Sequence, residues 1–178
     1  MSLLAERLLE IHRALQQVHL PHAFGGAIAL AYCTEEPRGT RDLDVNVFVS
    51  PDRAPEVFAA LPDPVAISPA DLQAAERDGQ IRLWWEDTPV DVFLDVHDFH
   101  RRVSRGVRWV PFEGHTIPVV GCTALAVFKA LLDRTKDWAD IEAMLEEDSL
   151  DVTDALAELT GMLGADSAPV RRLSALAG

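Results

Sequence analysis

Apolar residues recur at helical spacing in some segments of the chain and alternate with polar residues in others. Residues 3 to 18 place Leu, Ile and Val every three or four positions, which predicts an amphipathic helix. A second helix is expected directly after Gly26. Further helices are predicted at about 52–61, 69–78, 122–133, 135–147, 151–163 and 168–176.

Strict alternation predicts strands between these helices. The run DLDVNVFVS places Leu43, Val45, Val47 and Val49 on one face and its acids on the other. A short strand is expected at 22–24. Two more, IRLWWE and VDVFLDV, are joined by turn residues at 87–89, and a second hairpin is expected across VRWVPF and TIPVV.

This order of elements predicts an α+β fold with a mixed sheet, flanking helices and a C-terminal helical region. The composition shifts to helical near Gly121. We therefore expect a core over residues 1–120 and a helical region over 121–178 that packs on this core, so that both form one compact unit.

The composition limits the class of partner. Of 178 residues, 48% are hydrophobic and 25% charged, and the net charge is −13. Such an acidic chain is not expected to bind DNA stably and without sequence preference, because that affinity comes from cations that neutralise phosphates. Neither a signal-peptide block nor an apolar run of about 20 residues is present, so we expect a cytoplasmic protein without a membrane partner.

The two cysteines, Cys33 and Cys122, lack metal-ligand spacing, and each falls in an expected helix. Reduced thiols in the core are the prediction for both.

Three aspartates are candidates for a metal site. Asp42 and Asp44 lie two apart on one expected strand and so share a face, and the later strand VDVFLDV adds Asp91. Magnesium prefers carboxylate oxygens, and phosphoryl or nucleotidyl transfer needs such ions. An exposed strand face can also carry two aspartates without a function, but Asp is depleted from strands and usually has a reason to be there.

Gly25 and Gly26 lie between an expected strand and a helix. A helix N-terminus without side chains lets backbone amides approach a phosphate, whereas a plain turn is the alternative interpretation. We predict a triphosphate site here because the acidic strand follows.

The runs FGGAIALAY and RGTRDLDVNV resemble the nucleotidyltransferase superfamily of DNA polymerase beta, and in particular small bacterial members such as the AbiEii-type abortive-infection toxins. Arg38, Thr40, Asp42 and Asp44 match the family's pattern of Arg, Thr and two Asp. The resemblance extends over residues 20 to 147 and implies a polymerase-beta-like fold, an NTP substrate and a two-metal site. Ala27 departs from the Ser or Thr that often follows the glycines.

The segment FKALLDRTKDWADIEAML is similar to the helical segment of the same family. Lys129, Arg134, Lys136, Asp137 and Asp140 occupy its charged positions. The resemblance implies that Lys129 or Lys136 contacts the triphosphate. Pairs such as Arg134 with Asp137, or Lys136 with Asp140, on a solvated helix face are the alternative.

The predicted function is transfer of an NMP moiety from an NTP to an acceptor hydroxyl, with release of pyrophosphate. Asp42, Asp44 and Asp91 would bind two Mg²⁺ ions, or Mn²⁺ in their place. An RNA or protein acceptor in a toxin-like role, with an antitoxin as partner protein, is expected from the resemblance. The alternatives are an antibiotic-modifying nucleotidyltransferase and a non-catalytic member that binds nucleotide or a partner. The basic stretch 101–108 is either an RNA contact or a solvated hairpin edge.

The hairpin register makes one further prediction. A turn built on Asp87 and Thr88 would place Trp84 opposite Asp91 on the face of the acids. Burial of Trp84 in the core is the alternative.

Overall fold

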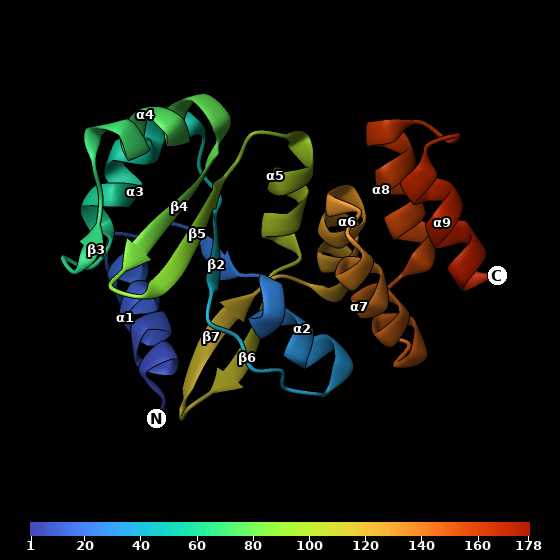
Figure 1. Cartoon of the computed structure of the whole chain (residues 1–178), viewed down its shortest axis with the longest axis horizontal. Helices are drawn as coiled ribbons and strands as arrows, with labels where there is room; N and C mark the ends of the chain where they lie inside the picture. Colours follow the sequence, from blue (N-terminus) through green and yellow to red (C-terminus); the bar gives the residue numbers. More distant parts are fainter. The chain divides into compact units, whose positions relative to one another are not determined.

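The computed structural model describes residues 1–178 and contains a seven-stranded mixed sheet with helices (Figure 1), which confirms the predicted α+β class. The strand order is β3-β4-β5-β2-β1-β7-β6. The elements are α1 (Leu3–Gln17), β1 (His22–Phe24), α2 (Gly26–Thr34), β2 (Leu43–Val47), the 3-10 helix η1 (Pro51–Arg53), α3 (Ala54–Ala60), β3 (Val65–Ala66), α4 (Pro69–Asp78), β4 (Gln80–Trp85), β5 (Thr88–Leu94), α5 (Asp98–Arg105), β6 (Arg108–Phe112), β7 (His115–Val119), α6 (Cys122–Leu132), α7 (Thr135–Glu146), α8 (Val152–Leu163) and α9 (Ala168–Ala177).

The chain divides into two compact units. Unit 1 contains Met1–Ile28 and Gly39–Val120, and with them the whole sheet; unit 2 contains Ala29–Arg38 and Gly121–Gly178. The predicted helical region therefore shares its unit with a segment from the first third of the chain. None of the helices is both long and apolar enough to span a bilayer.

The core of unit 1 lies on one face of the sheet. Central strand β2 pairs with β5 in parallel and with β1 in antiparallel register. Its residues Leu43, Val45 and Val47 are buried, as the alternating pattern predicts. Helix α1 adds the fully buried Leu8 and Ile11. Polar residues of β2 consequently face the other side of the sheet, where the aspartates lie.

A buried histidine pair joins α1 to β1. His22 Nδ1 lies 2.8 Å from the carbonyl oxygen of Leu20, which can only accept, so this nitrogen carries the proton. His22 Nε2 therefore accepts from His12 Nδ1 at 2.9 Å. Burial lowers the pKa of His12 to about 4, helped by the charge of His22, and burial also lowers the pKa of His22. The hydrogen bond is lost when both rings are protonated, because both facing nitrogens then carry a proton.

Arg7 of α1 fixes the turn between β4 and β5. Its guanidinium is buried and bonds Glu86, Thr88 and, at 3.4 Å, Asp87, and it lies 5.5 Å from the ring centroid of Trp85. Glu86 adopts a left-handed backbone conformation with φ 53°, which is costly for a non-glycine residue. The bond from Arg7 to the Glu86 carboxylate helps to hold this turn.

The predicted hairpin register is wrong. Trp85 pairs with Thr88, so the two-residue turn is Glu86-Asp87, one position earlier than predicted. As a result Arg82, not Trp84, lies opposite Asp91, and Trp84 lies opposite Pro89. The shift amounts to two residues along β4, so Trp84 keeps the predicted face. It is 47% exposed and is not a core residue.

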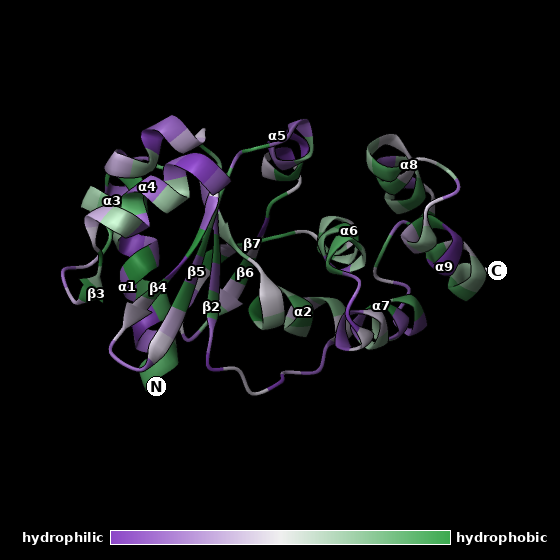
Figure 2. Ribbon diagram, turned by 45° about the horizontal axis from the view of Figure 1, so that its top comes forward, coloured by the Kyte–Doolittle hydropathy of each residue, from purple (hydrophilic) through white to green (hydrophobic).

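The core of unit 2 is built around α6, which contributes Leu125, Ala126 and Val127 and packs against α7 and α8. Figure 2 shows α6 mostly in the hydrophobic colour. Trp138 of α7 is fully buried, with Nε1 donating to Asp133 at 2.6 Å and Arg172 over its ring at 4.5 Å. The four C-terminal helices match the predicted spans within one residue at each end.

A disulfide in unit 2 contradicts the predicted free thiols. Cys33 near the end of α2 is bonded to Cys122, the first residue of α6, across a sequence separation of 89. Such a distance in sequence gives no hint that the two helices meet. Disulfides persist in oxidising environments, so this bond argues against the expected cytoplasmic location, which stays a prediction.

Helix α5 was not predicted. Its eight residues carry only Phe99 and Val103 as buried positions, and Figure 2 shows much of the helix in the hydrophilic colour. Residues 101–105 therefore lie on a helix and not on a hairpin edge, whereas Arg108 is the first residue of the edge strand β6. The two-residue strand β3 was also not predicted.

Candidate active site

The three predicted aspartates lie on the face of the sheet opposite the buried Leu43, Val45 and Val47, and we call them the acid row. Asp44 and Asp91 are paired residues of the parallel strands β2 and β5, so their side chains point to the same face. Asp42 precedes β2 by one residue and by alternation shares this face. The sheet register thus brings Asp44 and Asp91 side by side, and Asp42 lies directly before the strand that carries Asp44.

Arg82 continues this line onto β4. Its Nε donates to Asp91 Oδ1 at 2.7 Å and its Nη2 to Asp91 Oδ2 at 2.6 Å, a two-pronged contact, and Nη2 also lies 3.4 Å from Asp42 Oδ2. The hydrogen bond and charge of Asp91, with smaller effects of Asp42 and Asp44, raise the pKa of Arg82. Sequence reasoning did not single out Arg82; its only signal was a cation on an alternating strand beside two tryptophans.

The glycine pair lies against β2. The amide of Gly25 donates to the carbonyl oxygen of Asp44 at 2.8 Å. Gly26 opens α2 with φ 50°, and a Cβ at this position would overlap the Asp44 carboxylate. The space left by the absent side chain therefore holds a carboxylate oxygen. Any larger residue at Gly26 would displace Asp44 and adopt a strained backbone.

Thr40 supports the start of β2. Its hydroxyl accepts from the Asp42 amide at 3.2 Å and lies at the same distance from the Asp42 carbonyl oxygen. This local bond stabilises the backbone that carries the first acid of the row.

The carboxylate oxygens of the acid row are the type of ligand that binds divalent cations. Carboxylate oxygens are the ligands that Mg²⁺ prefers, and two of the three acids already hold a cation, the guanidinium of Arg82. The side chains are not arranged as a complete ligand set: nowhere in the chain do three or more Asp, Glu, His or Cys form a metal-binding group. Clustered carboxylates repel one another without a metal, and Arg82 separates Asp42 from Asp91.

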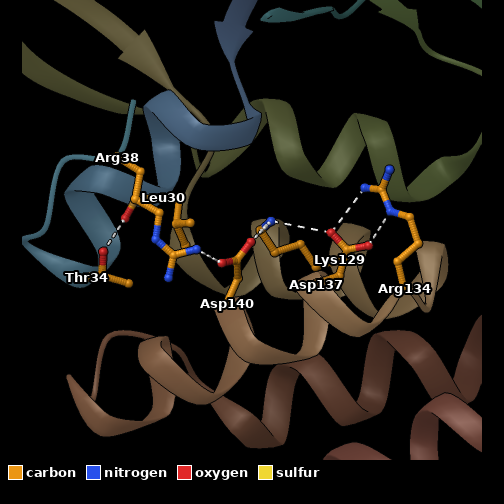
Figure 3. A network of polar contacts seen from close by, with 7 residues as sticks. All are labelled: Leu30, Thr34, Arg38, Lys129, Arg134, Asp137 and Asp140. Atoms are coloured by element: carbon orange, nitrogen blue, oxygen red, sulfur yellow. Dashed lines mark hydrogen bonds and ion pairs between the residues drawn. The ribbon is translucent and has the colours of Figure 1, made fainter. Parts of the chain in front are cut away.

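The other predicted residues lie in unit 2, and all of them except Lys136 belong to a set of contacts that we call the ion network (Figure 3). Its members are Arg38, Lys129, Arg134, Asp137 and Asp140. Lys129 Nζ donates to Asp140 at 2.6 Å and lies 3.6 Å from Asp137. Arg38 pairs with the other oxygen of Asp140, and Arg134 Nε donates to Asp137 at 2.6 Å. Both carboxylates are buried, and Asp137 is 1% exposed.

This network gives the two predicted lysines different surroundings. Lys129 is buried and already bound by two carboxylates, whereas Lys136 is exposed. Of the two expected helix pairs, Arg134 with Asp137 is present, and Asp140 is bound by Lys129 and Arg38. Burial raises the pKa of Asp137, but the hydrogen bond and charge of Arg134 and the charge of Lys129 lower it further, so the net shift is downward.

The fold is that of the nucleotidyltransferases. The crystal structure of ANT(2'')-Ia in complex with adenylyl-2''-tobramycin matches with a TM-score of 0.59 and 15% identity, over 98% of this chain and 97% of that one. The solution structure of the antibiotic-resistance factor ANT(2'')-Ia matches with a TM-score of 0.57 and 14% identity, over 96% and 89%. At this identity the likeness shows the fold alone. No family sequence profile and no curated protein sequence matches the chain.

Proposed function

We propose that the chain transfers an NMP moiety from an NTP to an acceptor hydroxyl and releases pyrophosphate. The observation that carries this proposal is the direct pairing of Asp44 with Asp91 on adjacent strands, with Gly26 against the Asp44 carboxylate, in a nucleotidyltransferase fold. None of the three acids is fully buried: the Asp42 side chain is 42% exposed and that of Asp91 16%, so solvent reaches both.

Asp42, Asp44 and Asp91 would hold two Mg²⁺ ions, or Mn²⁺. Such ions bridge phosphate oxygens and stabilise the charge on the attacking and leaving oxygens. Asp91 would ligate the catalytic ion and would also accept the proton of the acceptor hydroxyl. Thr40 keeps the backbone of Asp42 in place.

The nucleotide phosphates are proposed to lie against the amides that follow Gly25-Gly26 at the start of α2. Contacts of Arg38, Lys129 and Lys136 with the triphosphate stay a prediction. Lys136 is the better candidate of the two lysines, because its exposed ammonium is available without breaking a buried ion pair. Replacement of each lysine by Ala, with NTP affinity as the readout, tests the two contacts separately.

A small cationic acceptor molecule, such as an amino sugar that offers a hydroxyl, fits the negative charge of the chain best. The net charge of −13 attracts polycations and repels RNA. ANT(2'')-Ia, a fold neighbour over nearly the whole chain, was solved with adenylyl-2''-tobramycin. We therefore favour an antibiotic-modifying role over the toxin-like role that the sequence resemblance implies.

An RNA or protein acceptor, with an antitoxin partner, is the second candidate. The observation in its favour is α5, whose exposed Arg101, Arg102 and Arg105 concentrate positive charge on an otherwise acidic unit.

The test incubates the purified protein with Mg²⁺, each α-labelled NTP, and either a panel of aminoglycosides or total tRNA. We expect label on an aminoglycoside and none with Asp44→Asn. Label on tRNA would select the second candidate. NTP binding without transfer to any acceptor, protein hydroxyls included, would indicate a non-catalytic member.

A further inference from the structure

We infer that Arg82 is a resident cation of the acid row, which binds Asp91 before a metal does and must be displaced when the metal arrives. This inference rests on the proposed function, because it concerns the same carboxylates. It assigns to Arg82 a role of its own: to set how tightly the row binds divalent cations.

The contact geometry supports this role. Arg82 binds both oxygens of Asp91 with its Nε and Nη2, at 2.7 and 2.6 Å, so the lone pairs best directed to a metal are in use. The same Nη2 reaches Asp42, and Arg82 therefore bridges the first and third acids of the row. A metal ligated by Asp42 and Asp91 would have to occupy the position of this guanidinium.

Burial shows which partner can move. Asp91 is held on a central strand and its side chain is 16% exposed, whereas that of Arg82 is 50% exposed. Arginine does not lose its proton at any ordinary pH, so it cannot yield to a metal by becoming neutral. Rotation of its long side chain into solvent is the available route. Arg82 is thus a competitor that leaves, not a ligand.

The strand register makes this competition specific. Arg82 is the direct cross-strand neighbour of Asp91 on β4, and Asp44 is the neighbour on β2. In an antiparallel pair, directly opposed residues are the closest side chains across the ladder. The metal-free row is therefore neutralised in part from within the sheet, which limits repulsion among its carboxylates.

Mn²⁺ binding to the whole chain, without nucleotide or acceptor, tests the inference by electron paramagnetic resonance of the free ion. We expect Arg82→Gln to bind Mn²⁺ about two- to fivefold more tightly than the parent, as for the loss of a half-exposed ion pair. Arg82→Lys, which keeps the charge and loses the two-pronged contact, should lie between them. Arg53→Gln, which removes an equal charge from an exposed pair with Glu56, should bind like the parent.

Weaker or unchanged Mn²⁺ binding by Arg82→Gln, with measurable binding by the parent, would overturn the inference and leave the proposed function standing. Weaker binding would mean that Arg82 orients Asp91 for the metal. If neither the parent nor Arg82→Gln bound Mn²⁺ while both were folded, both this inference and the metal site of the proposed function would fail. Circular dichroism of each variant establishes the fold.

Discussion

The acid row of unit 1 and the ion network of unit 2 both combine aspartates with basic side chains, but they differ in composition and in burial. The row has three carboxylates, and Arg82 forms ion pairs with two of them, Asp42 and Asp91. The network surrounds two carboxylates, Asp137 and Asp140, with three cations. The network's acids are buried, whereas Asp42 is well exposed.

This difference separates a structural role from a binding role. A buried carboxylate must be compensated by cations, and removal of a partner leaves an unpaired charge in a poorly hydrated place. Carboxylates that are partly open to solvent can instead be reached by a cation from outside. We therefore predict a metal-binding role for the aspartates of the row and a structural role for those of the network.

The largest effect should come from Asp44→Asn. We expect transfer to fall by two to three orders of magnitude or more, as for the loss of a group that stabilises transition-state charge. The free energy of unfolding should stay equal or rise, because one of several clustered negative charges is removed. Asp52→Asn, an exposed change in η1, is the control. A marked loss of stability in Asp44→Asn would make this residue structural and so erase the contrast between the units.

Lys129→Met, unlike Asp44→Asn, should lower the free energy of unfolding. Removing the buried ammonium leaves Asp140 and Asp137 undercompensated, and we expect unfolding in urea to become easier by about 2 to 4 kcal/mol. Lys136→Met changes the other lysine of the chain, which is exposed, and should alter stability by less than about 0.5 kcal/mol. Equal effects of the two changes would contradict the structural role of the network.

The dependence of stability on pH should come from the histidine pair of unit 1 and not from the ion network of unit 2. The folded-state pKa of His12 is lowered to about 4, so the unfolded chain binds more protons between pH 6.5 and 4. Stability should therefore be complete above pH 6.5 and decline by roughly 2 kcal/mol as the pH falls to 4. Asp137 does not contribute in this window because its pKa is lowered.

Urea unfolding at several pH values measures this decline. His12→Gln should flatten it, whereas His97→Gln, a change at an exposed histidine, should leave it intact. A decline of the same size in His12→Gln would place its origin outside the histidine pair.

The smallest effect concerns Trp84, which shares the face of the acid row and is exposed. If its ring stacks on the nucleotide base or the acceptor, Trp84→Ala should weaken binding by about 1 kcal/mol, or roughly fivefold. Trp109→Ala, on the exposed β6, should not. Quenching of tryptophan fluorescence by NTP with Mg²⁺ in the two variants provides the measurement, and equal quenching and affinity would remove Trp84 from the site.

The alternation of β2 and the spacing of the C-terminal helices were sufficient to predict most elements, because both patterns reflect burial on one face. Helix α5 was missed because HDFHRRVSR carries too few apolar residues to show a period. The pairing of Asp44 with Asp91 could be predicted only in part. Alternation shows which face of its own strand each aspartate occupies, but it does not show that the two strands are parallel neighbours in this register.

Other features depend on contacts that sequence spacing does not reveal. Cys33 and Cys122 are 89 residues apart, and neither has a neighbour that signals the bond. The burial of Asp137 and Asp140 arises from helix packing, so their charges looked like a solvated face. Arg82 was overlooked because the turn-forming residues Asp87 and Pro89 suggested a hairpin one position later along the chain.

That alternative hairpin shows what Arg7 contributes. A slip of two residues keeps every side chain of β4 on its own face, so the hydrophobic pattern alone would accept either register. In the slipped hairpin an indole, not a guanidinium, would stand opposite Asp91. Arg7 binds Glu86, Asp87 and Thr88, the residues that distinguish the two registers. A residue of α1, far from the acid row in sequence, therefore decides whether the third carboxylate of the row faces a cation or an aromatic ring.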